Sequence, residues 1–298
     1  MNEIDGSAMR TAVRTDLTDD VREEATFFGA GQRLFGVTHR PADASVGVVV
    51  CSPIHAELLR NYRREVDLAR SLARSGYAVQ RFHYRGSGSS DGEPGSVTFE
   101  SLAEDVAAAA DVLVETTGVE RLVYVGTRLG AVAAAVAARS TGVAGFAAWE
   151  PVLNGDRYFR EIFRGHLVSG LKKTQNGQER KPQQEMRDLG SVDVLGYPID
   201  RPLYESVRAR RLMDDLAVAS PHILLLRIGG SKTLAGEQET LVGRWRDAGA
   251  TVQTYLLPGA EPWWFGLAPE MASEDPTRGE TLVEVTTEWM LHSVPPRA

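Results

Sequence analysis

The segment Gly126-Thr127-Arg128-Leu129-Gly130 carries the clearest chemical signal in this chain. It joins an apolar run, RLVYVG, to an alanine-rich run, LGAVAAAVAAR, and this order predicts a strand, a sharp turn and a helix. In a G-x-S-x-G turn of this kind the central serine is a nucleophile on strained backbone, and the flanking glycines leave room for the opposing chain. Both glycines are present, but the central residue is Arg128, whose guanidinium stays protonated and cannot act as a nucleophile.

An arginine at the start of a helix suggests a different chemistry. The helix N-terminus and the guanidinium both favour an anion, so one interpretation is a pocket that grips a carboxylate or phosphate of a ligand. The other is an internal ion pair with Glu57, Glu150 or Glu261, which all fall on loops expected at the same edge of the sheet. Structural ion networks are commoner than ligand sites, so the sequence favours the internal pair, although both can coexist.

Two other groups of residues could carry chemistry. Cys51 and Ser52 end the apolar run SVGVVVCSP close to His55, and a cysteine or serine near a histidine can be an activated nucleophile. The alternative is that Cys51 points into the core and Ser52 bonds its own loop. His83 and Tyr84 end the next expected strand and could form an acid–base pair, but a histidine that hydrogen-bonds the adjoining loop is the favoured interpretation.

Further features give weaker signals. The glycine- and serine-rich loop 85–92 lacks the spacing of a nucleotide-binding motif, so nucleotide binding there is rejected. Trp263 and Trp264 either cover an apolar ligand or fill a cleft as core, and the sequence does not separate these. The remaining histidines have no metal-ligand spacing, so we expect no metal and no cofactor; they are His39, His166, His222 and His292.

These residues must be positioned by alternating strands and helices, which predict an α/β fold with a mostly parallel sheet and an opening antiparallel hairpin. Residues 153–218 break the alternation and are expected to form an inserted cap containing a mobile polar loop, KKTQNGQERKPQQE. The core is then residues 25–152 and 219–298. Residues 1–24 are expected to be a flexible leader.

Composition limits the class of protein. The chain has 298 residues, a formal net charge of −7 and one cysteine, which argues against a nucleic-acid groove and excludes an internal disulfide. No apolar stretch is long enough for a membrane span, and the polar N-terminus is not a signal peptide. We therefore expect a cytoplasmic location.

The chain resembles the α/β hydrolases related to serine aminopeptidases, and more specifically the exosortase-A-system-associated hydrolases and their actinobacterial relatives. The matching segments are FFGAGQRLFGVTHRP, CSPIHAELLRNYRR, RFHYRGSGSSDG, VGTRLGA, WEPVLNGDRYFRE and DVLGYPIDRPLYESV. Much of that group carries G-x-R-x-G, so the resemblance implies that the arginine is a family feature. His83 and Glu150 stand where the group has aspartates.

The resemblance also places the other two triad members. The acid would follow HILLLRIGG, where the chain has residues 230–233, GSKT, and the histidine would lie in residues 259–265, GAEPWWF. Neither segment holds the expected residue, so the leading hypothesis is a pseudo-hydrolase that has lost its Ser-Asp-His triad. It would bind an acyl-type or anionic small molecule, or assist a partner enzyme in biosynthesis.

Two alternatives stay open. One is a non-covalent lyase, cyclase or isomerase that uses Arg128 with His83 or a glutamate. The other is a cryptic esterase, thioesterase or acyltransferase that uses Ser52 or Cys51. The residues expected to contact a ligand all lie at the predicted carboxyl edge of the sheet: Pro53, Ile54, His55, Glu57, Thr127, Arg128, Leu129, Glu150, Glu261, Trp263 and Trp264.

Overall fold

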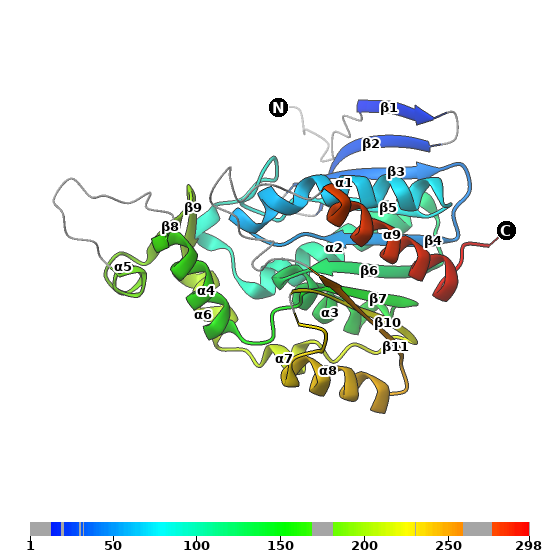
Figure 1. Cartoon of the computed structure of the whole chain (residues 1–298). Helices are drawn as coiled ribbons and strands as arrows, with labels where there is room; N and C mark the ends of the chain where they lie inside the picture. The colour runs from blue at the N-terminus through cyan, green and yellow to red at the C-terminus, as the bar shows by residue number, and fades with distance from the viewer. Residues whose placement is uncertain are drawn as a thin grey trace, which may run out of the picture.

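The computed structural model describes residues 13–18, 21–29, 31, 33–168, 181–229, 231–258 and 276–297. Its centre is a nine-stranded sheet in the order β1-β2-β3-β5-β4-β6-β7-β10-β11 (Figure 1). The first pairs, as far as β3 with β5, are antiparallel, and all pairs from β5 with β4 onward are parallel. This confirms the predicted fold class: an opening hairpin followed by a mostly parallel sheet flanked by helices.

The strands of the sheet are β1 Val13–Thr18, β2 Val21–Phe28, β3 Leu34–Pro41, β4 Val46–Cys51, β5 Ala78–Phe82, β6 Arg121–Thr127, β7 Gly145–Trp149, β10 His222–Gly229 and β11 Thr251–Pro258. A separate hairpin pairs β8 Ser191–Val194 with β9 Tyr197–Asp200. The helices are α1 Ala56–Arg74, α2 Phe99–Thr117, α3 Leu129–Thr141, α4 Gly155–Val168, α5 Pro182–Leu189, α6 Arg201–Arg208, α7 Leu212–Asp215, α8 Gly236–Asp247 and α9 Pro276–Ser293, with a short 3₁₀ turn at Pro94–Ser96.

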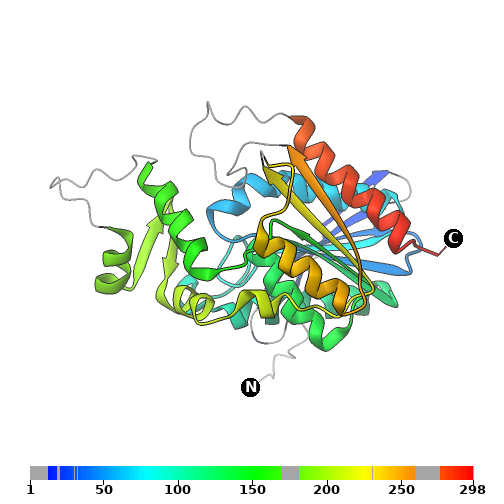
Figure 2. The same ribbon diagram turned by 60° about the horizontal axis from the view of Figure 1, so that its bottom comes forward.

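The strands near the centre are apolar throughout because both of their faces are covered. In β4, Val48 and Val50 belong to the core beneath α1 and α9, whereas Val49 and Cys51 belong to the core beneath α2 and α3. Figure 2 shows α1 and α9 together on one face of the sheet and α3 and α8 on the other. The sheet therefore separates two apolar layers, and its loops are the exposed parts available for chemistry.

Helices α4, α5 and α6 and the β8–β9 hairpin lie between β7 and β10 in the chain and gather at one end of the sheet (Figure 1). They fall within residues 153–218, the expected cap, and they contain a hairpin that was not predicted. Part of the polar segment expected to be a loop is helical, because Pro182 begins α5, where its fixed φ suits the first turn. Residues 172–180 of that segment lie outside the described residues.

The N-terminal region differs from the expected leader. Residues 13–18 form β1, which pairs with β2, and β2 begins at Val21, within the expected leader of residues 1–24. A backbone ladder to an already formed strand can hold such an edge strand without a strong apolar pattern, which explains why the sequence did not indicate it. Among the described residues, no helix is long and apolar enough to cross a membrane.

Candidate functional site

The segment 126–130, called the elbow below, turns sharply between β6 and α3. Arg128 stands at its apex with φ 54° and ψ −121°, a conformation that side chains rarely adopt. A Cβ at Gly126 would lie 2.4 Å from the Cα of Ala131, and a Cβ at Gly130 would lie 2.2 Å from the carbonyl oxygen of Ser52. Both contacts are with backbone, so only glycine fits, as the sequence predicted for a turn that presents its central residue at the sheet edge.

The Arg128 side chain is buried among groups from the first turn of α1, from the end of β7 and from α4. Its Nε donates to Oε1 of Glu57 at 3.0 Å, and its Nη1 donates to the carbonyl oxygen of Glu150 at 3.4 Å. Its Nη2 lies 3.6 Å from Oε2 of Glu161 on α4. The Tyr158 hydroxyl donates to the second Glu57 oxygen at 2.9 Å, and the guanidinium carbon lies 5.6 Å from the centre of the same ring.

The electrostatics of this group follow from burial and pairing. Burial raises the pKa of Glu57, and the Arg128 charge and the hydrogen bonds from Arg128 and Tyr158 offset part of that rise. Burial alone would lower the pKa of Arg128, but its neighbours, Glu57 first, more than compensate and raise it. The arginine is therefore held in its charged form beside a carboxylate that is screened from water.

Of the three glutamates predicted as partners, the structure places two at Arg128. Glu57 supplies its carboxylate and Glu150 its carbonyl oxygen, while the Glu150 carboxylate accepts a hydrogen bond from the backbone N–H of Ile228 at 2.5 Å. Glu261 lies outside the described residues. Sequence reasoning missed Glu161, which follows Tyr158 by three residues on α4 and so shares a helix face with it.

Strained backbone is concentrated at this edge. His55, Arg128 and Glu150 have φ values of 52°, 54° and 46°, and they follow β4, β6 and β7, which are neighbours in the sheet. Strain of this kind persists only where the surroundings enforce it, and it clusters at functional sites. The carboxyl ends of β4, β6 and β7 are therefore the candidate functional region of this chain.

The candidate nucleophiles lie at the end of β4. Cys51 is fully buried, and burial raises the pKa of its thiol. Ser52 is 4% exposed, and its hydroxyl donates a hydrogen bond to Oε2 of Glu65 on α1 at 2.6 Å. Burial raises the pKa of Glu65 to about 7, against the lowering effects of Ser52 and Arg81. Ser52 thus has a carboxylate partner that the sequence analysis did not name.

A signal for that partner does exist in the sequence. Glu57, Asn61 and Glu65 follow one another at intervals of four in α1 and are buried, on the helix that also buries Leu68 and Leu72. A helix normally buries apolar residues along such a stripe, so polar residues there indicate specific partners. The pattern marks both Glu57 and Glu65.

His83 and Tyr84 have separate environments. The Nδ1 atom of His83 accepts the backbone N–H of Ser89 at 3.2 Å, so His83 hydrogen-bonds the adjoining loop. A Cβ at Gly88 would lie 2.3 Å from that atom, which is why this loop needs glycine. Burial, followed by the charge of Arg81, lowers the pKa of His83. Tyr84 is 4% exposed, and its hydroxyl has no hydrogen-bond partner among the described residues.

A cavity of about 130 Å³ lies between the loops after β4 and β5 and the cap. Pro53, Ile54 and His55 line it, as do His83 and Tyr84. Three predicted contact residues belong to the elbow, Thr127, Arg128 and Leu129, and they are buried but do not line this cavity. The structure thus divides the predicted residues into two groups, one around Arg128 and one around this cavity.

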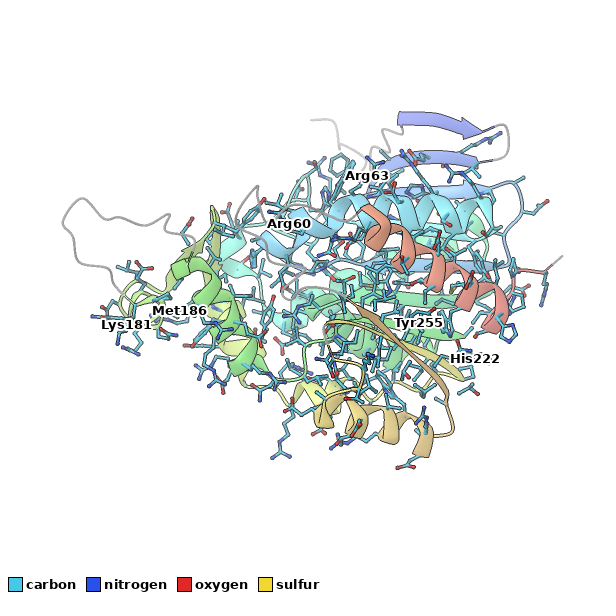
Figure 3. The ribbon with its side chains drawn as sticks, viewed as in Figure 1. Arg60, Arg63, Lys181, Met186, His222 and Tyr255 are labelled. Atoms are coloured by element: carbon cyan, nitrogen blue, oxygen red, sulfur yellow. The ribbon has the colours of Figure 1, made fainter. Side chains whose placement is uncertain are left out.

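The remaining predicted positions fall away from both groups. After β10, the Ser231 hydroxyl bonds the backbone of Thr233, as in a local turn. Trp263 and Trp264 lie outside the described residues. Figure 3 shows His222 at the opposite end of the sheet from Lys181 and Met186 of the cap. Within the described parts of the chain, no cluster of three or more acidic, histidine or cysteine residues could hold a metal.

Comparison with known proteins agrees with this architecture. Residues 43–187 match the family model described as serine aminopeptidase, S33. The chain has the α/β-hydrolase fold. In this fold the nucleophile stands on the turn between a strand and the following helix, which is the turn that carries Arg128 here. No curated protein matches the sequence significantly.

Several solved structures of esterases and α/β hydrolases are similar to this chain in fold. The Pyrococcus furiosus esterase Pf2001 is 14% identical, with 98% of this chain and 99% of that chain covered and a TM-score of 0.62. Est1E from Butyrivibrio proteoclasticus, bound to ferulic acid, is 14% identical over 90% and 99% of the two chains, with a TM-score of 0.60. The α/β hydrolase GrgF from Penicillium sp. sh18 is 15% identical over 95% and 98%, with a TM-score of 0.60. At these identities the likeness extends to the fold alone.

Proposed function

We propose that this protein with the α/β-hydrolase fold is a pseudo-hydrolase: it binds a small molecule without hydrolysing it. The observation that carries the proposal is the 3.0 Å contact between Arg128 and Glu57 at the apex of the elbow. A guanidinium has no lone pair available for attack on a carbonyl carbon. Its charge is also balanced by a buried carboxylate, so it is a poor site for an anionic ligand, and we propose a structural role for this ion pair.

The proposal also accounts for the strained backbone. A positive φ at a non-glycine residue costs free energy of folding, and in a serine hydrolase the strained residue is the catalytic nucleophile. Here Arg128 instead links β6, α1 and α4, since its partners Glu57 and Glu161 belong to those two helices. The elbow then fixes the cap and the loop after β4 relative to the sheet, and these segments form walls of the cavity.

The chemistry can be tested with a fluorophosphonate probe and with para-nitrophenyl acetate, an activated ester. We expect no saturable labelling of the folded chain and no turnover above that of a heat-denatured sample. Mass-spectrometric mapping would locate any adduct. Saturable labelling that is lost in Ser52→Ala would overturn the proposal.

One observation favours a second candidate, an esterase centred on Ser52. Its hydroxyl donates to Glu65 at 2.6 Å, and a carboxylate with a pKa of about 7 has the basicity of a general base at neutral pH. The Ser52 oxygen would add to an ester carbonyl carbon while its proton passes to Glu65 and then to the departing alcohol, and water would release the acyl group. In that case Glu65→Gln would abolish both turnover and labelling, whereas Arg128 variants that fold would retain them.

The non-covalent alternative has less support. The partners of Arg128 lie on α1, on α4 and at the end of β7, whereas His83 packs against Phe35 of β3 and Tyr62 of α1 and bonds the loop after β5. An acid–base group must reach the same reacting atoms as its electrostatic partner. Arg128 and His83 are therefore not placed to act on the same substrate atoms.

A further inference from the structure

The cavity beside the elbow has walls from three parts of the chain. The loop after β4 contributes Ile54 and His55, the loop after β5 contributes Tyr84, and the cap contributes Tyr197 and Leu203. Its volume of about 130 Å³ is close to that of an engineered protein cavity of about 150 Å³ that binds benzene. The space therefore suits one small ring or a short chain.

Two polar atoms of the lining residues lack partners. The Tyr84 hydroxyl and the Nε2 atom of His55 are buried, and neither has a hydrogen bond among the described residues. Tyr84 as a whole is 96% removed from solvent, since its exposed fraction is 4%. Buried polar groups without partners are rare in folded proteins, and each calls for an explanation such as a missing ligand or water. An oxygen-bearing ligand in this cavity would supply the partner.

The charges of the residues that line the cavity indicate whether its ligand is charged or neutral. Arg85 is the charged residue of the lining, and its guanidinium is already bound by Asp105 at 2.6 Å and by Glu104 at 3.0 Å. Burial lowers the pKa of His55 to about 4, so its imidazole is neutral at physiological pH. Burial, followed by the charge of Arg81, also lowers the pKa of His83, the second imidazole of the lining. The remaining side chains of the lining are apolar or bear a hydroxyl, so the cavity offers no unpaired charge to a cation or an anion.

We propose that this cavity binds a neutral molecule with an apolar ring or short chain and one hydroxyl or carbonyl oxygen, held by Tyr84 and His55. The proposal deepens the proposed function and rests on it, because it names the ligand class of a protein that binds without hydrolysing. It also places the ligand in a cavity whose lining does not include Arg128.

Fluorine NMR with three matched probes tests this: para-fluorophenol, para-fluorotoluene and para-fluorobenzoate. We expect para-fluorophenol to bind at least about fivefold more tightly than the other two, because the toluene leaves the polar atoms unpaired and the benzoate carries an uncompensated charge. Tyr84→Phe should remove most of the preference for the phenol over the toluene. It should leave the fold intact, since it deletes only an unpartnered hydroxyl.

A pair of neighbouring substitutions locates the binding site. Leu58 lines the cavity, whereas Leu59, the next residue of α1, is 64% exposed and does not. Leu58→Trp should fill the opening and weaken phenol binding more than about tenfold, in keeping with lost access to a preformed pocket. Leu59→Trp should leave binding unchanged.

Three outcomes would overturn the inference: no phenol binding by the folded chain, binding that Leu58→Trp leaves intact, or tighter binding of the benzoate. Each of these leaves the proposed function standing if the fluorophosphonate still fails to label the protein. Conversely, saturable labelling at Ser52 would remove the proposed function while the phenol titration still reports whether the cavity binds its probe.

Discussion

The Nε atom of Arg128 lies 3.0 Å from Oε1 of Glu57, and both side chains are almost completely removed from solvent. This contact joins the turn after β6 to the first turn of α1. A buried ion pair adds little net stability compared with apolar residues of the same size, but the loss of one partner strands the other charge. At the position where a serine hydrolase has its nucleophile, this chain therefore has an ion pair whose two members depend on each other.

Arg128→Ala should lower the free energy of unfolding by about 3–5 kcal/mol, because it leaves Glu57 buried without its cation. The double variant Arg128→Met with Glu57→Leu should lose less than the two single changes added together. Chemical denaturation measures all of these. The control is Arg63→Ala on α1, whose pair with Asp67 is exposed and contributes about 1 kcal/mol or less (Figure 3). An Arg128→Ala effect no larger than that of the control would contradict the buried-pair interpretation.

Placing a serine at the apex of the elbow should not create an esterase. Arg128→Ser combined with Glu57→Gln would place a hydroxyl at the apex, but His83 is occupied by the Ser89 N–H. A serine without a base is a weak nucleophile at neutral pH. We expect para-nitrophenyl acetate turnover to stay at the level of Arg128→Ala with Glu57→Gln. A turnover clearly above that of this control would show that a general base is within reach.

Gly130→Ala should be strongly destabilising. The added methyl would lie 2.2 Å from the Ser52 carbonyl oxygen and 2.5 Å from that of Cys51, so the loop after β4 would have to move. We expect a loss of several kcal/mol, as for other overpacked sites, and weaker binding in the neighbouring cavity. Gly243→Ala in α8 is the matched control: its Cβ meets nothing within 4 Å, and it should stabilise the chain by about 0.5–1 kcal/mol. Similar melting temperatures for the two variants would refute this.

Stability should depend on pH through buried groups with opposing effects, Glu65 on one side and His55 and His39 on the other. The folded chain holds the Glu65 proton up to about pH 7, above the usual value of 4.5, so Glu65 makes stability fall as pH rises through that window. His55, lowered from 6.5 to about 4, binds fewer protons when folded and makes stability rise with pH over its own window. Glu65→Gln should therefore steepen the rise in unfolding free energy between pH 4.5 and pH 6.5. An unchanged slope would mean that Glu65 is ionised throughout.

Much of the fold was predictable because it depends on local patterns. The apolar run of β4 and the glycine that ends α2 in a left-handed conformation, Gly118, both have strong local causes. The elbow was equally predictable, since the requirement for Gly126 and Gly130 follows from steric contact alone. The strand β1 and the β8–β9 hairpin were not predicted, because their short strands depend on pairing rather than on a distinct apolar pattern.

The candidate site was only partly predictable, for a physical reason. The sequence identified Arg128 and Glu57 from their places at strand and helix ends. It could not assign Glu161 or Tyr158, because the packing of α4 at the end of the sheet is a tertiary contact without a local sequence signature. Glu65 was missed for another reason: its position on the buried stripe of α1 is visible only if polar residues on that stripe are treated as signals.

The row of strained residues at the ends of β4, β6 and β7 has a consequence for protein engineering. The backbone that displays a side chain at the apex of the elbow is enforced by Gly126, Gly130 and the neighbouring main chain, none of which depends on a serine being present. Display and reactivity are thus separable properties of this scaffold. A designer could vary the displayed residue together with Glu57 and keep the turn unchanged, because the main chain holds its shape while the side chains define its use.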